Sequence, residues 1–203
     1  NFSADGIRSG RQNGAKAIAE DFAVTGRFDY TGIPGLNAGV SLYTGNSGQT
    51  MTGSDGSGLG VRTSIIALHS LYSRRGFDAR FLYAHGKIDE VARLNTVLGY
   101  SGEKSIGEMQ RGYYFTFASD VLQHLDPYPP ETLQPFIQYE SLNAQGRVPT
   151  DATKHAALDR TNLTLGFVYK PIPNVGFKAD YVNRSNAAES ATDQFNLAMV
   201  YMF

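Results

Sequence analysis

The stretch VGFKADYV (residues 175–182) decides the fold, because apolar residues alternate along it with charged or small ones. The apolar positions are Val175, Phe177, Ala179 and Tyr181, and the charged positions are Lys178 and Asp180. Successive side chains of a β-strand point to opposite faces, so the stretch predicts a strand with one apolar and one charged face. Two environments fit such a strand: a soluble sheet packed on a core, and a membrane sheet facing lipid.

The same period of two recurs in nine segments along the 203-residue chain. They cover residues 21–31, 36–45, 64–72, 77–85, 111–119, 134–141, 161–170, 175–182 and 194–203. Tight turns (32–35, 73–76, 171–174) alternate with long polar connections (46–60, 86–110, 145–160, 185–193), and 123–132 is long where a tight turn is expected. This alternation predicts an all-β, antiparallel up-and-down sheet with tight turns at one end and long loops at the other.

Composition supports strands and excludes several classes of function. The chain has 12 Phe, 12 Tyr and 22 Gly, and its formal charge of −1 gives no indication of a nucleic-acid partner. The absence of cysteine excludes disulfides and thiolate metal sites. The four histidines lack ligand spacing, and residues 52–60 carry one carboxylate, so we expect no metal and no cofactor.

Three features favour the membrane environment. Tyr and Phe gather near the segment ends on the apolar face, as in the aromatic girdles of outer-membrane proteins. Segments of about ten residues match a tilted transmembrane strand, and such strands must close into a barrel because lipid cannot solvate the backbone. The apolar stripe 195–203 ends at Phe203, which resembles the C-terminal signature that the barrel-assembly machinery reads.

These features predict a transmembrane antiparallel β-barrel in a bacterial outer membrane. A periplasmic C-terminus puts the long connections outside and starts the first of the nine segments outside. Bacterial barrels have even strand numbers, so we expect upstream strands and take residues 1–203 as the C-terminal part of one barrel domain. Residues 1–20 are expected to be an extracellular or pore-lining loop.

Residues 86–110 are expected to be a long extracellular loop with a short helix. Ile88, Val91, Leu94, Val97 and Leu98 are spaced as on one face of a helix, with Asp89 to cap the start and Gly99 to end it. The helix either packs on its own rim or folds into the lumen to narrow it.

Several stretches resemble the bacterial porins grouped with the phosphate-selective porin O/P family. They are GIRSGRQNGAKAIAEDFAVTGRFDYTGIPGLNAGVSLYTGNSGQ, GYYFTFASDVL, LQPFIQYESLNAQ, LTLGFVYKPIPNVGFKADY and DQFNLAMVYMF. The resemblance implies a barrel of about sixteen strands, often a homotrimer, that acts as a passive channel for small hydrophilic solutes. Its family name suggests phosphate, but this part of the chain shows no run of inward basic residues.

Eight side chains opposite the apolar stripes are candidates for lining the pore. They are Arg27, Asp29, His69, Asp78, Arg80, Glu140, Lys178 and Asp180. Three opposite-sign pairs occur at i, i+2: Arg27/Asp29, Asp78/Arg80 and Lys178/Asp180. The pairs either set up a transverse field across the pore or bond neighbouring strands together.

The segment 6–16 carries Arg8, Arg11 and Lys16 with no acidic residue among them. It is either a loop bent into the pore that attracts anions, or a basic surface loop that touches lipopolysaccharide. Its small size argues against nucleic acid.

His69 is relevant to the alternative that the protein is an enzyme, because some outer-membrane barrels are lipases with a Ser–His pair. If Arg74 and Arg75 form a two-residue turn, Tyr72 pairs with Phe77 and His69 faces inward, away from Ser70. We therefore expect a polar wall residue and no catalytic activity. A barrel with loop-based adhesion or enzymatic function, and a soluble β-sandwich binding module, are the alternatives.

Overall fold

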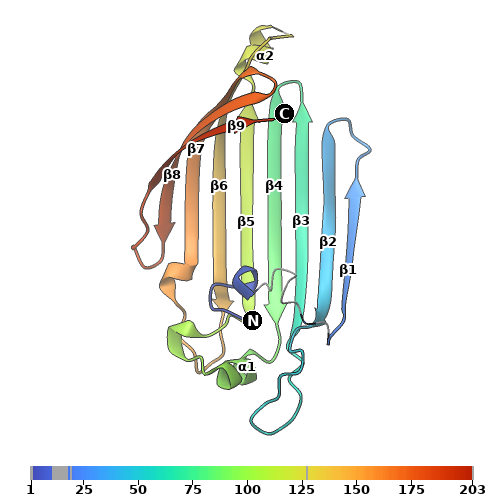
Figure 1. The fold of residues 1–203 in the computed structure, drawn as a ribbon, viewed down its shortest axis with the longest axis vertical. Helices are drawn as coiled ribbons and strands as arrows, with labels where there is room; N and C mark the ends of the chain where they lie inside the picture. Colours follow the sequence, from blue (N-terminus) through green and yellow to red (C-terminus); the bar gives the residue numbers. More distant parts are fainter. Residues whose placement is uncertain (1, 11–17, 19, 127, 203) are drawn as a thin grey trace.

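The computed structural model describes residues 2–10, 18, 20–126 and 128–202, and it contains one nine-stranded sheet. Each strand pairs antiparallel with its neighbours in sequence, in the order β1 to β9 (Figure 1). The strands are β1 (Ala23–Tyr30), β2 (Leu36–Asn46), β3 (Arg62–Arg74), β4 (Phe77–Ile88), β5 (Met109–Ser119), β6 (Thr132–Arg147), β7 (Asp159–Ile172), β8 (Val175–Asn186) and β9 (Gln194–Tyr201). The prediction of an all-β, up-and-down sheet is confirmed, and β1 and β9 are its edge strands.

Most strands extend beyond their predicted ends toward the long loops. β6 has 16 residues, although alternation is visible only over 134–141. Backbone pairing continues past the apolar stripe, because polar side chains keep the extended backbone and its ladder of hydrogen bonds. The apolar pattern therefore marks only a belt across longer strands.

The two-residue turn between β3 and β4 lies one residue further along the chain than predicted. Arg74 pairs with Phe77, so the turn residues are Arg75 and Gly76, with φ of 53° and 79°. Positive φ at both central residues is the type I′ geometry that suits a hairpin. The expected pairing of Tyr72 with Phe77 is wrong, since Tyr72 pairs with Ala79, but the shift is even and leaves every side chain on its predicted face.

The helix expected within 86–110 is α1 (Val91–Leu98). Glu90, with φ of 57°, occupies the N-cap position, so the predicted cap by Asp89 is wrong. Gly99 ends the helix in the left-handed conformation, as predicted. Short 3-10 turns occur at η1 (Ile7–Gly10), η2 (Gly102–Lys104) and η3 (Ala156–Leu158).

The long connection after β5 contains α2 (Val121–Leu125), which the sequence pattern did not predict. The Asp120 carboxylate accepts the N–H of Leu122 at 3.2 Å and that of Leu133 at 3.2 Å. The same side chain therefore caps the helix and holds the start of β6.

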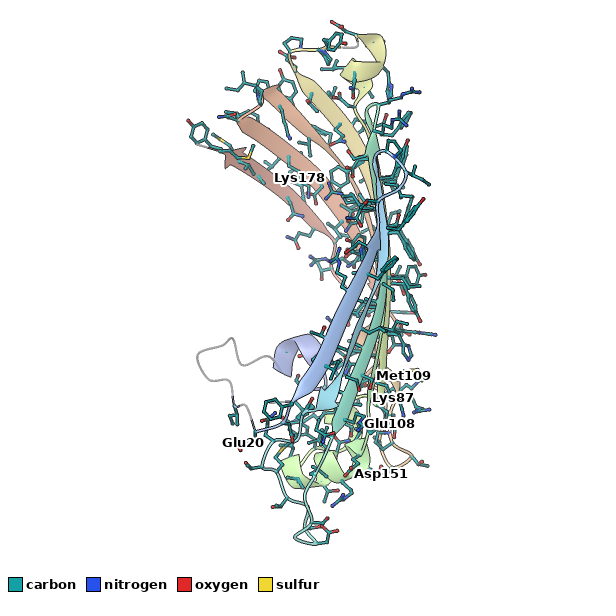
Figure 2. All side chains as sticks on the ribbon, turned by 90° about the vertical axis from the view of Figure 1, so that its right-hand side faces the viewer. Glu20, Lys87, Glu108, Met109, Asp151 and Lys178 are labelled. Carbon is teal, nitrogen blue, oxygen red and sulfur yellow. The ribbon has the colours of Figure 1, made fainter. Side chains whose placement is uncertain are left out.

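The sheet is curved. Figure 1 shows the long loops and α1 at one end, here named the long-loop end, and the short turns and α2 at the other, the short-turn end. Seen from the side in Figure 2, the sheet has a concave face, where Lys178 lies, and a convex face, where Lys87 and Met109 lie. Residues 2–10 lie on the concave side near the long-loop end (Figures 1 and 2).

Most of the buried hydrophobic residues gather at the long-loop end and not between sheets. Leu59, Val61, Ile88, Val91, Leu94 and Ile106 form this core, with Phe2 and Ile7 packed against it. Arg93 of α1 ties the loop after β2 to this core through Glu90 at 2.7 Å, Asp55 at 3.2 Å and Ser57.

The apolar stripes of the convex face are largely exposed. Phe28 is 68% exposed and Leu197 is 74% exposed. Among the described residues no second sheet covers them, so the packing partner that a soluble β-sandwich requires is not found there. No described helix is long and apolar enough to cross a membrane.

Candidate functional site on the concave face

The strand register places all eight predicted wall residues on one face of the sheet. Residues paired directly across antiparallel strands share a face, and this relation can be followed from strand to strand. One row of partners contains Asp29, Gly39, His69, Leu82, Tyr114 and Glu140. A second row contains Asp78, Ala118, Phe136, Gly166 and Asp180.

The three cations lie two residues from members of these rows and therefore on the same face. They are Arg27, Arg80 and Lys178. Because Lys178 lies on the concave side in Figure 2, this charged face is the concave one. The prediction that the charged side chains share the face opposite the apolar stripes holds for each of the eight.

Arg27, Asp29 and His69 form one cluster across β1 and β3. Arg27 donates from Nε to Asp29 Oδ2 at 2.7 Å and from Nη2 to Oδ1 at 2.9 Å. His69 Nε2 lies 2.6 Å from Asp29 Oδ1, so the carboxylate bonds both partners. The strand between them has Gly39, where a Cβ would lie 2.2 Å from the Phe28 carbonyl oxygen and 2.9 Å from His69 Cε1. Glycine is required here because the backbone of β1 approaches this position closely, and the side chains of the cluster lie next to it as well.

Lys178 and Asp180 form a second cluster on β8. The Lys178 ammonium lies 3.0 Å from Asp180 Oδ2 and 5.1 Å from the centre of the Phe136 ring. Asp180 is 5% exposed and also accepts from Asn196 Nδ2 at 2.8 Å. A buried carboxylate with a cation and an amide donor is well satisfied, and Asn196 bonds β8 to β9.

The third pair, Asp78 and Arg80, lies on β4, with Arg80 Nε 2.9 Å from Asp78 Oδ1. In all three pairs the ionic bond is made within one strand, and the carboxylates of Asp29 and Asp180 also bond residues of other strands. His69 and Asn196 make the links between strands. Glu140, by contrast, has no ion pair among the described residues and remains a separate acidic group.

The N-terminal residues dock onto this face. The Ile7 N–H donates to Gln110 Oε1 at 2.9 Å, and a Cβ at Gly86 would lie 2.9 Å from Ile7 Cδ1. A cavity of about 680 Å³ remains beside them, lined by Ile65, Leu82, Ala84, Leu142 and Glu140 among others. The concave face therefore has an apolar floor with charged groups around it.

Of the three basic residues in the segment 6–16, only Arg8 lies within the described part of the chain, as a member of η1. Arg11 and Lys16 lie outside the described residues, as does Phe203.

Two histidines bear on the alternative of an enzyme of the Ser–His type. His69 bonds Asp29 and Arg27, and Ser70 points to the opposite face. Another pair, Ser119 Oγ and His124 Nε2 at 2.8 Å, lies at the short-turn end, but no carboxylate among the described residues bonds His124. The orienting third group of a catalytic triad is therefore missing there.

Sequence reasoning did not find two residues that shape the clusters, Gly39 and Phe136. A glycine within a strand is a weak signal for close approach of side chains. Phe136 has the same parity as Gln138 and Glu140, and it lies on the concave face beneath Lys178.

An uncharacterised protein of Aquifex aeolicus (strain VF5) is similar to this chain. The two are 27% identical over 198 residues, which make up 95% of this chain and 44% of that protein. The chain therefore spans less than half the length of this relative. No protein-family model and no solved structure matches the chain.

Proposed function

We propose that this chain is the C-terminal part of an outer-membrane β-barrel, and that the complete barrel is a porin. It would form a water-filled channel for passive diffusion of small hydrophilic solutes or ions, including anions such as phosphate. One observation carries the proposal: the sheet is curved, with charged side chains on its concave face and exposed apolar side chains on its convex face. A lipid-facing wall around an aqueous lumen has this arrangement.

The nine strands described here do not form a closed wall, since β1 and β9 do not pair with each other. β1 and β9 have free edges, and lipid cannot satisfy the backbone groups of a free edge. The similar Aquifex protein is more than twice as long as this chain. We therefore propose that upstream strands of the same polypeptide complete a barrel of about sixteen strands, which is within the known range, and that three copies form a homotrimer.

The charges of the concave face favour weak selectivity. The candidate wall residues include three cations, Arg27, Arg80 and Lys178, and four carboxylates, Asp29, Asp78, Asp180 and Glu140. Six of these seven are paired within their own strand, which reduces the field that a passing ion meets. We propose no catalytic step, and residues 2–10 would narrow the lumen near its outer mouth.

In the proposed orientation the long-loop end faces the exterior and its lipopolysaccharide. Phe203 would be the signal that the barrel-assembly machinery reads.

Planar-bilayer recording of the full-length protein tests the proposal. We expect stepwise conductance increases and, in a salt gradient, a reversal potential close to zero. The same preparation should migrate differently on a detergent gel before and after heating. A folded, heat-modifiable protein without conductance steps would contradict the porin function and leave the barrel in place.

A further inference from the structure

A set of basic side chains borders the apolar belt of the convex face at the long-loop end. This basic rim set consists of Arg62, His85, Lys87 and Arg111. His85 is paired with Ile66 on one side and with Arg111 on the other, so all three share the convex face. Lys87 is paired with Ser64 in the next row, and Figure 2 shows it on the convex side. Arg62 lies two residues before Ser64 and faces the same way.

Nearby carboxylates neutralise only part of this positive charge. Lys87 bonds Asp89 at 2.7 Å, and the neighbouring Arg147 bonds Glu108 at 2.6 Å. No side-chain hydrogen bond or ion pair is found among the described residues for Arg62, His85 or Arg111. These three side chains are therefore available to an external anion.

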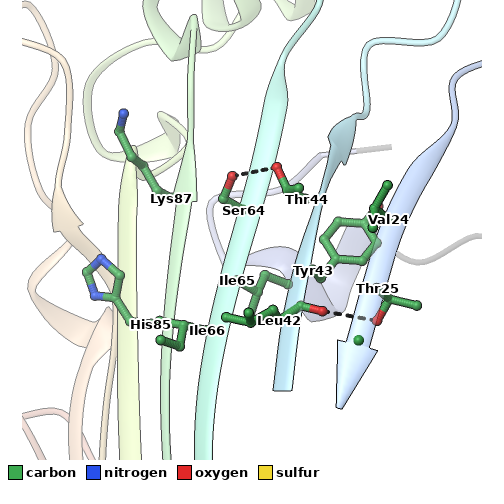
Figure 3. Close-up of a pocket in the computed structure, with 11 residues that line it drawn as sticks. Val24, Thr25, Leu42, Tyr43, Thr44, Ser64, Ile65, Ile66, His85 and Lys87 are labelled. Atoms are coloured by element: carbon green, nitrogen blue, oxygen red, sulfur yellow. Dashed lines mark hydrogen bonds between the residues drawn. The ribbon is translucent and has the colours of Figure 1, made fainter. Parts of the chain in front are cut away.

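An apolar groove leads away from the basic rim set along the convex face. Its volume is about 550 Å³, and Val24, Leu42 and Ile66 line it together with His85 and Lys87 (Figure 3). Gly26 forms part of the lining, and a Cβ added there would meet nothing within 4 Å. The hydroxyl groups of Thr44 and Ser64, 3.0 Å apart, lie between the apolar part and Lys87. The register places Gly26, Leu42, Ile66, His85 and Arg111 in one row of partners, so the surface changes from apolar to basic across the sheet, from β1 to β5.

We propose that this groove and the basic rim set form a binding site for one phosphorylated lipid. An acyl chain lies over Gly26 and beside Leu42 and Ile66, and the phosphate is held at the other end of the same row by His85 and Arg111. In a membrane the acyl chain is already out of water, so the groove contributes van der Waals contact with the chain, and a guanidinium binds phosphate through two parallel hydrogen bonds. The inference rests on the proposed function in one respect, since it requires the convex face to lie in a membrane. An inorganic anion would leave the apolar groove unused, and a second copy of this chain would have to neutralise the rim.

Native mass spectrometry of the full-length protein in detergent micelles tests the site. The probes are bis-phosphorylated lipid A, the same lipid without phosphates, and inorganic phosphate. We expect the phosphorylated lipid to bind, and Arg111→Gln or Gly26→Leu to weaken its binding about tenfold, as expected for one charge-assisted bond or for a blocked chain site. Arg111→Lys, which keeps the charge but not the two parallel hydrogen bonds, should weaken the binding less than Arg111→Gln does. Arg74→Gln, at the short-turn end, is the matched control and should bind as the unchanged protein does.

Three results would overturn the proposal. If the lipid without phosphates binds as tightly as the phosphorylated lipid, the basic rim set does not contribute to binding. Displacement of the lipid by millimolar inorganic phosphate alone would indicate a free-anion site. A change of oligomeric state in Gly26→Leu would indicate that the groove belongs to an interface between copies. Conductance is recorded on the same samples, so a protein that conducts but does not bind the lipid contradicts this inference alone, and one that binds without conducting contradicts only the porin function.

Discussion

At the scale of single residues, two glycines of the sheet differ in what surrounds them. Gly39 lies beneath the Arg27–Asp29–His69 cluster, where an added Cβ would be 2.2 Å from a backbone oxygen. Gly26, one strand away, has open space in the same position. Backbone atoms cannot move aside as the end of a flexible side chain can, so only Gly39 is strictly required.

We expect Gly39→Ala to destabilise the folded sheet by about 1–3 kcal/mol, the usual cost of overpacking, whereas Gly26→Ala should be close to neutral. The temperature at which the full-length protein loses its folded band on a detergent gel measures the difference. Equal temperatures for the two variants would show that the backbone of β1 does not approach Gly39 as closely as described.

The charge of Lys178 is balanced almost entirely by one neighbour, the buried Asp180. We expect Asp180→Asn to leave the cation uncompensated and to shift the reversal potential toward anion preference, and Lys178→Gln to shift it the opposite way. Recording in a salt gradient measures both shifts. Asp151→Asn, in the exposed loop after β6, is the control and should shift neither. Shifts of the same sign in the two variants would contradict a lumen position for the pair.

At the scale of elements, the β8–β9 hairpin is held at its loop by Asp193. Its carboxylate accepts the Tyr181 hydroxyl, the Arg184 N–H at 2.9 Å and Asn183 Nδ2 at 3.2 Å. The hydrogen bond from Tyr181, followed by that from the Arg184 backbone, lowers the pKa of Asp193. The ionised form is therefore favoured by folding.

Because the pKa of Asp193 is lower in the folded state, its contribution to stability is complete above the unfolded pKa of about 4 and is lost as pH falls through the folded value. We expect the hairpin loop to become sensitive to an acid-active protease at low pH. Asp193→Asn should be sensitive already at neutral pH and should show a weaker dependence on pH. An unchanged pH profile in this variant would indicate that the carboxylate does not hold the loop.

Helix α1 depends on Leu94, which is 0% exposed in the core of the long-loop end. We expect Leu94→Ala to cost about 2–5 kcal/mol locally and to make the segment around α1 accessible to proteases, with the sheet intact. Val97→Ala on the same helix, where Val97 is 37% exposed, should have little effect. Limited proteolysis followed by mass spectrometry locates the cuts, and loss of the sheet itself would contradict an independent core.

The elements that alternation predicts and those that it misses differ in a physical way. β1 to β9 could all be predicted, because one face of each is apolar over many residues. The far ends of β3 and β6 could not, since polar residues pair through the backbone and leave no pattern. α2 was missed because five residues are too few to show a helical period. The face of every wall residue followed from the alternation, but the partners of Asp29 and Asp180 depend on neighbouring strands, whose register a single segment does not encode.

At the scale of the whole molecule, the exposed apolar face and the two edge strands of the described sheet should make the isolated chain poorly soluble in water. We expect residues 1–203 expressed alone to sediment without detergent, because apolar faces and strand edges associate. Centrifugation with and without detergent measures this. A monodisperse monomer in plain buffer would contradict the proposed barrel wall.

The single compact core at the long-loop end has a consequence for assembly. In the proposed orientation this end must cross the membrane, while Leu59, Val61, Leu94 and Ile106 cannot form their cluster in transit. The core then closes only after arrival, from the loop before β3, the end of β4 and the connection between β4 and β5. Once the core has closed, the folded loops are too bulky and their outer surface is too polar to pass back through the membrane. Folding of the loops would thus make insertion of the barrel effectively irreversible.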